Sequence, residues 1–137
     1  MEYLIYDNAY FDDFFEMALD LWKDFPKNDL RRVLLEIGES EKKQVFFAKD
    51  ADSLIGFVYI SIRQDYVEGA DVSPTGYLEG IYVKPDYRKK GIAQELFTLG
   101  ENWVSQNGCH QIGSYTWDWN KSSIVFHKKI GFKERIP

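Results

Sequence analysis

The chain has 137 residues, of which 45% are hydrophobic and 17% aromatic. It contains 17 Lys+Arg and 22 Asp+Glu, which give a formal net charge of −5. The length suits one domain over residues 1–137, and the acidic balance argues against a nucleic-acid partner, because duplex binding usually needs a basic face. A cationic substrate fits an acidic protein better, although many cytoplasmic proteins are mildly acidic.

The single cysteine, Cys109, leaves no internal disulfide to form and favours a reducing compartment. The N-terminal residues lack the basic flank and the long apolar run of a signal peptide, and we find no segment that predicts a membrane span. No cluster of histidines and cysteines predicts a metal site. We therefore expect a cytoplasmic protein that contacts no membrane and needs no metal.

Apolar periodicity, capping residues and turn residues predict alternating strands and helices. In chain order these are a strand over 2–6, helices over 9–23 and 28–37, strands over 44–49, 54–63 and 76–83, a helix over 91–106, a strand over 110–117 and a helix over 121–130. Asp7 or Asn8 can cap the first helix, and the DADS turn at 50–53 joins its two neighbouring strands as a hairpin. The order predicts a mixed α/β sheet with helices packed on it.

The junction between strand 76–83 and the following helix carries the most informative pattern. An interior glycine such as Gly80 often marks a bulge or a close approach by another chain or a ligand. A helix N-terminus presents free N–H groups and a positive dipole end, and a glycine there, Gly91, lets an anion approach the backbone. The basic residues before it are Arg88, Lys89 and Lys90. The pattern predicts a phosphate site, but a solvated basic turn would also explain the charges.

The spacing Arg88-x-x-Gly91-x-Ala93, after a strand with an internal glycine, resembles the acetyl-CoA-binding motif of the GCN5-related N-acetyltransferases, the GNAT family. The later segment from Asn120 to Gly131-Phe132 resembles the family's closing pattern of asparagine, helix and Gly-Phe. The resemblance covers nearly the whole chain. It implies the GNAT acyl-CoA N-acyltransferase fold, with a central, mostly antiparallel sheet flanked by helices, and acetyl-CoA as cosubstrate.

The resemblance also implies which residues bind acetyl-CoA. The basic loop and helix start would wrap the pyrophosphate, the strand would offer backbone groups to the pantetheine arm, and Asn120 would hold that arm. The residues concerned are Ile81, Tyr82, Val83, Arg88, Lys89, Lys90, Gly91, Ile92, Ala93 and Asn120. His127 stands where many relatives have a tyrosine, so it is a candidate proton donor to the departing thiolate. A packed or exposed helix histidine remains an open alternative for it.

Residues 61–93 look like the corresponding stretch of aminoglycoside 6′-N-acetyltransferases. The matching patterns are Arg63-x-Asp65-Tyr66-Val67-x-Gly69, Ser73-Pro74, Leu78-Glu79-Gly80-Ile81-Tyr82-Val83 and, earlier, Leu21-Trp22. The resemblance implies that the acetyl group goes to the 6′-amine of an aminoglycoside, a cationic small molecule. It makes Glu79 the base or the substrate-orienting carboxylate, because the amine must lose a proton before it attacks the thioester. Strand alternation predicts that Glu79 and Ile81 share one face.

The substrate-binding residues that the resemblance implies are Trp22, Tyr66, Glu79, Tyr115 and Asp118. Core packing remains an alternative for Trp22, which lies on the apolar face of its helix. Pairing with a neighbouring cation, or simple exposure, remains an alternative for Glu79. The aminoglycoside group usually has an aspartate at the position of Tyr115, and Asp118 is the candidate replacement.

Relatives carry a further strand after the Gly-Phe, so the resemblance implies a shortened last strand and an open sheet edge. Because homodimers are common in the resembled group, we expect a homodimer. Two other functions remain open. One is a GNAT acetyltransferase for a polyamine, another small amine or a protein amine, which Tyr115 favours. The other is a CoA-binding relative without catalysis.

Overall fold

The computed structural model describes residues 1–63, 74–109 and 112–114. The elements are β1 (Glu2–Ile5), η1 (Asn8–Tyr10), α1 (Phe11–Leu21), α2 (Lys27–Ile37), β2 (Lys43–Asp50), β3 (Ser53–Arg63), β4 (Thr75–Val83), η2 (Pro85–Tyr87), α3 (Ile92–Gln106) and β5 (Ile112–Ser114). The helix predicted over 121–130 lies outside the described residues. The strand predicted over 110–117 is confirmed at 112–114, the part of it that the structure describes. The remaining predicted elements are confirmed, with boundaries shifted by a few residues.

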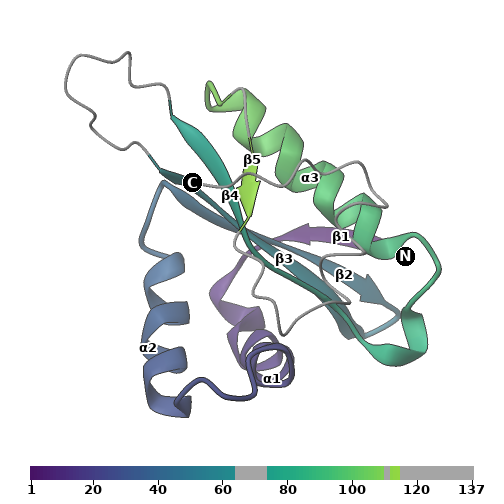
Figure 1. The fold of residues 1–137 in the computed structure, drawn as a ribbon. Helices are drawn as coiled ribbons and strands as arrows, with labels where there is room; N and C mark the ends of the chain where they lie inside the picture. The colour runs from purple at the N-terminus through teal and green to yellow at the C-terminus, as the bar shows by residue number, and fades with distance from the viewer. Residues whose placement is uncertain (64–73, 110–111, 115–137) are drawn as a thin grey trace, which may run out of the picture.

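The sheet has five strands in the order β1-β2-β3-β4-β5. The first four are antiparallel to their neighbours, and β5 runs parallel to β4. Figure 1 shows α1 and α2 on one face of the sheet and α3 on the other. The predicted mixed sheet with flanking helices is therefore confirmed, including the hairpin of β2 and β3.

Local signals in the sequence explain where the first helices begin and end. The Asp7 side chain accepts a hydrogen bond from the Ala9 N–H at 2.9 Å, so it caps η1, which leads into α1. α1 stops at Leu21 because Trp22 leaves the helical conformation, with φ −110° and ψ 62°. Pro26 then precedes α2, whose first residue is Lys27.

Hydrophobic clusters fill both faces of the sheet. The cluster under α1 and α2 contains fully buried Phe14, Leu34 and Phe57, whose burial supplies much of the driving force for this layer. The cluster under α3 contains Val58 and Leu96. Phe57 and Val58 are neighbours in β3 and point to opposite clusters, as strand alternation requires. Both helical layers therefore pack on the same two strands, β3 and β4.

Candidate active site at the bulge of β4

A β-bulge lies in the middle of β4. Tyr59 of β3 pairs with Gly80, but the next residue, Ile60, pairs with Leu78, so Glu79 is an extra residue with no partner opposite it. A bulge of this kind interrupts the regular alternation of side chains and bends the strand. The sequence indicated a bulge near Gly80, and the register confirms it.

The bulge overturns the prediction that Glu79 and Ile81 share a face. The Glu79 carboxylate contacts Ser61. The Ser61 side chain points to the α1 and α2 side, as does that of Tyr59 two residues earlier in β3. Ile81 packs against the cluster under α3. The inserted residue shifts the alternation by one position, so the two side chains point to opposite faces of the sheet.

Glu79 is held by two donors from β3. The Ser61 hydroxyl donates to Glu79 Oε1 at 2.7 Å, and Arg63 Nη2 donates to the same oxygen at 2.6 Å. The Glu79 side chain is 21% exposed and that of Arg63 38%. The pairing with a cation that the sequence left open is therefore present, and the carboxylate still reaches solvent.

A buried phenol borders this carboxylate. Tyr59 is 7% exposed, and burial raises the pKa of its hydroxyl well above 10, with the charge of Glu79 adding to the effect and that of Arg63 opposing it. The Tyr59 hydroxyl therefore stays neutral and protonated at physiological pH.

Trp22 lies over the bulge. A Cβ built on Gly80 would come within 2.4 Å of Trp22 Cζ2, so only glycine permits this approach. The Trp22 ring also packs against Phe57, with centroids 5.9 Å apart. The core packing predicted as an alternative for Trp22 is confirmed, and the same ring lies beside the residue that follows Glu79. The close approach predicted at Gly80 is made by this helix end.

The second half of β4 has an open edge among the described residues. β5 pairs only with Gly76, Tyr77 and Leu78. The Lys84 N–H donates to the Ile55 carbonyl on β3, so alternation turns the backbone of Tyr82 toward β3 as well. The backbone groups of Ile81 and Val83 point the other way, toward the open edge. Of the three residues that the resemblance assigned to pantetheine, these two face the edge where a ligand could form backbone hydrogen bonds, although the Val83 carbonyl already accepts one from Arg88 Nε.

The loop after β4 has the shape of an anion-binding nest. Lys89 adopts φ 66° and Gly91 φ 80°, both left-handed, and Gly91 is the N-cap of α3. A Cβ on Gly91 would meet nothing within 4 Å, so the space over the loop is open to a phosphate. Arg88, Lys89 and Lys90 are all exposed around it. The described residues thus fit the pyrophosphate that the resemblance implies.

Ordered side chains fix this loop against the sheet. Arg88 Nε donates to the Val83 carbonyl at 2.7 Å, and the Lys90 ammonium lies 5.5 Å from the ring centre of Tyr87. The Tyr87 hydroxyl donates to Asp50 Oδ2 at 2.9 Å, on the β2–β3 hairpin. Ile92, the first residue of α3, has a buried side chain, so it can contact an anion only through its N–H, and the partly buried Ala93 follows it.

Several predicted site residues lie outside the described residues: Tyr66, Tyr115, Asp118, Asn120 and His127. In 1–63, 74–109 and 112–114 no group of three or more His, Cys, Asp or Glu side chains could hold a metal ion. No helix in the same part of the chain is long and apolar enough to cross a membrane.

Sequence reasoning missed the two donors to Glu79. Ser61 and Arg63 are two residues apart in β3. This spacing is the only signal in the sequence that their side chains share a face. Their partner comes from another strand, and the register between β3 and β4 decides which residue of that strand they reach. The hydrogen bond from the Tyr82 hydroxyl to Asp20 Oδ2, at 2.5 Å, joins β4 to α1 in the same way.

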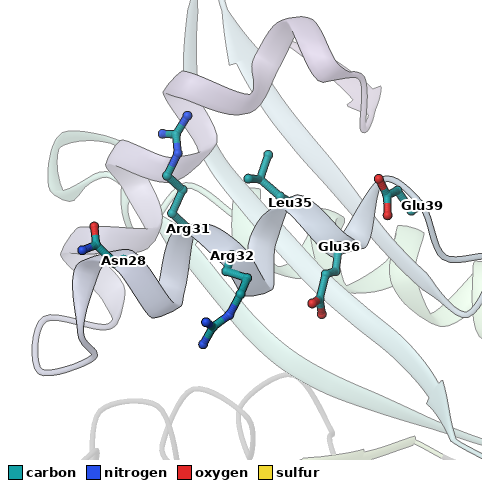
Figure 2. A pocket seen from close by; sticks show the side chains of 6 residues that line it. All are labelled: Asn28, Arg31, Arg32, Leu35, Glu36 and Glu39. Atoms are coloured by element: carbon teal, nitrogen blue, oxygen red, sulfur yellow. The ribbon is translucent and has the colours of Figure 1, made fainter.

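A hollow of about 350 Å³ lies elsewhere, along the exposed side of α2. Figure 2 shows the side chains that line it: Asn28, Arg31, Arg32, Leu35, Glu36 and Glu39. All of them come from α2 and its C-terminal end, and none comes from β4 or the basic loop. We do not include this hollow in the candidate active site.

Comparison with known proteins decides the family. The model of the acetyltransferase (GNAT) family matches residues 9–132. The chain belongs to this family. The bulged β4 and the basic loop after it are therefore parts of a GNAT fold, as the motif Arg88-x-x-Gly91-x-Ala93 predicted.

Curated relatives and solved structures agree with this family. An aminoglycoside N(6′)-acetyltransferase type 1 of Salmonella typhimurium is 33% identical over 93% of this chain and 88% of its own. One of Serratia marcescens is 32% identical over 96% of this chain and 90% of its own. The structure of aminoglycoside N-acetyltransferase AAC(6′)-Iy in complex with CoA is 30% identical, with a TM-score of 0.88 over 99% of this chain and 90% of its own.

We expect Gly80→Ala to destabilise this GNAT chain by about 1–3 kcal/mol, because the new methyl group overlaps the packed ring of Trp22. Urea unfolding would measure the change. Gly100→Ala is the control, since the nearest atom to its Cβ would be Ile60 Cδ1, at 3.1 Å, the end of a flexible side chain on the other face of the sheet. Equal stability of Gly80→Ala and the wild type would contradict the close approach of Trp22.

Proposed function

We propose that this chain, as a single domain over residues 1–137, transfers the acetyl group of acetyl-CoA to the 6′-amine of an aminoglycoside. The observation that carries the proposal is the position of Glu79, a partly exposed carboxylate in the bulge of β4. Relatives and structural neighbours named as aminoglycoside 6′-acetyltransferases support the acceptor. One neighbour was solved with the bisubstrate analogue CoA-S-monomethyl-acetylneamine.

The reaction requires a neutral amine at the thioester carbonyl. The protonated 6′-amine gives a proton to Glu79, directly or through water, and its nitrogen then attacks the carbonyl carbon. The C–N bond forms, and the C–S bond breaks with its electron pair on sulfur. The new amide loses a second proton while the CoA thiolate takes one up. One proton is therefore released for each acetyl group transferred.

The remaining roles follow from the resemblance. Asn120 is proposed to hold the pantetheine arm together with the backbone of Ile81 and Val83, and His127 to protonate the thiolate. Trp22, Tyr66, Tyr115 and Asp118 are proposed to contact the aminoglycoside. The proposal includes a cytoplasmic homodimer. A reducing compartment fits Cys109, which is buried and free.

Gly91→Asp should raise the Kd of acetyl-CoA by roughly tenfold or more, because it places a carboxylate in the space left for the pyrophosphate at the start of α3. Isothermal titration calorimetry at fixed ionic strength would measure the change. Gly108→Asp is a matched control, since Gly108 has φ 84° and open space around it at the far end of α3. Equal Kd values for the two variants would contradict the phosphate site.

The substrate assignment is tested by CoA release from acetyl-CoA across a panel of acceptors. We expect turnover with kanamycin- and tobramycin-like drugs that carry a free 6′-amine and none with aminoglycosides that lack it. Polyamines serve as a second set of cations without the sugar rings. Turnover of polyamines alone would refute the aminoglycoside proposal while leaving the acetyltransferase in place.

Glu79→Gln should lower kcat/KM for the 6′-amine by about 100-fold, because the amide cannot take the proton. The Kd of acetyl-CoA should stay within about twofold of the wild type, since Glu79 lies on β4 before the phosphate loop. Glu101→Gln, at an exposed position on α3, is the control. Normal turnover by Glu79→Gln would remove the proposed role of this carboxylate.

A further inference from the structure

Both donors to Glu79 act on the same carboxylate oxygen. Ser61 Oγ and Arg63 Nη2 each donate to Oε1, at 2.7 and 2.6 Å. Within the described residues, no group donates to Oε2. A carboxylate has two oxygens that can each accept hydrogen bonds. Two donors on one oxygen restrict rotation of the carboxylate and leave the other oxygen available.

The two donors are themselves fixed in place by the sheet. Ser61 is 4% exposed and pairs in register with Tyr77, so Glu79 reaches it diagonally across the bulge. The Arg63 guanidinium lies 4.4 Å from the ring centre of Tyr77. Stacking on an aromatic ring orients the planar guanidinium, which then presents its N–H groups in a fixed direction.

The charge of Arg63 is unexpected beside a site for a cation. A guanidinium next to Glu79 reduces the negative potential that would attract an ammonium group. Its presence is therefore poorly explained by substrate attraction, and its short contact with Oε1 offers a different explanation. Precise placement of a base can contribute more to a rate than added attraction contributes to binding.

We propose that Arg63 is a positioning residue for acetyl transfer: together with Ser61 it occupies Glu79 Oε1 and directs Oε2 toward the acceptor amine. This inference rests on the proposed function, in which Glu79 receives the proton of the amine. It implies that Arg63 acts on the rate only through Glu79. It also implies that removing Arg63 slows turnover without weakening acceptor binding, because one repulsive charge is lost.

The test is a double-mutant cycle of Arg63→Met and Glu79→Gln, measured as CoA release with a 6′-amine acceptor. Arg63→Met should lower kcat by about 10- to 100-fold, with an acceptor KM unchanged or lower. In the Glu79→Gln background the same change should have almost no further effect, because the group through which Arg63 acts is already gone. Independent losses in the double variant would overturn the inference, as would a rise in KM alone.

Conservative and control variants make the cycle specific. Arg63→Lys keeps a cation within reach and should recover part of the kcat lost in Arg63→Met, although a lysine lacks the planar fork. Arg32→Met is the matched control, because it removes an exposed ion pair with Asp29 on α2, at 3.0 Å. It should leave kcat within about twofold of the wild type.

A direct structural measurement separates this inference from the proposed function. A wild-type protein that acetylates no 6′-amine would contradict the proposed function. Crystal structures of the wild type and Arg63→Met would then decide the inference. A Glu79 carboxylate that rotates away from Ser61 in the variant would support it, and an unmoved carboxylate would overturn it.

Discussion

The geometry of the candidate site depends on one extra residue in β4. In a regular strand Gly80 would point to the opposite face from Glu79. The bulge instead puts both residues on the α1 and α2 side, where Glu79 reaches Ser61 and Arg63 and Trp22 lies over Gly80. A bulge lacks some of the ladder hydrogen bonds of a regular strand. The bulged strand makes the packing of Trp22 over Gly80 and the ion pair of Glu79 on the same face.

β4 also brings different kinds of polar group close together in the chain. Its bulge carries the Glu79 carboxylate, its later backbone groups face the open edge, and the loop after Val83 carries the basic residues. The open edge begins where pairing with β5 stops, at Leu78. The carboxylate, the open edge and the basic loop therefore follow one another along a single short segment of chain.

Much of this was predictable from the sequence, because local patterns determine it. The cap at Asp7, the hairpin of β2 and β3 and the glycine before α3 each depend on residues close together in the chain. The prediction that Glu79 and Ile81 share a face was wrong, because a bulge depends on how β4 pairs with β3. The contact of Arg63 with Glu79 was missed for the same reason: the residue that Arg63 reaches is set by the register between strands.

The separation of charges along β4 has a further physical consequence. Val83 is four residues beyond Glu79, which corresponds to about 13 Å of extended strand. This exceeds the Debye length of about 8 Å at physiological ionic strength. The positive charges of Arg88, Lys89 and Lys90 follow Val83 in the chain, so they are screened from Glu79 more strongly than the charge of Arg63 is. Among the cations of the described residues, Arg63 is the one in contact with Glu79, at 2.6 Å, and so it acts on the carboxylate more strongly than the basic loop does.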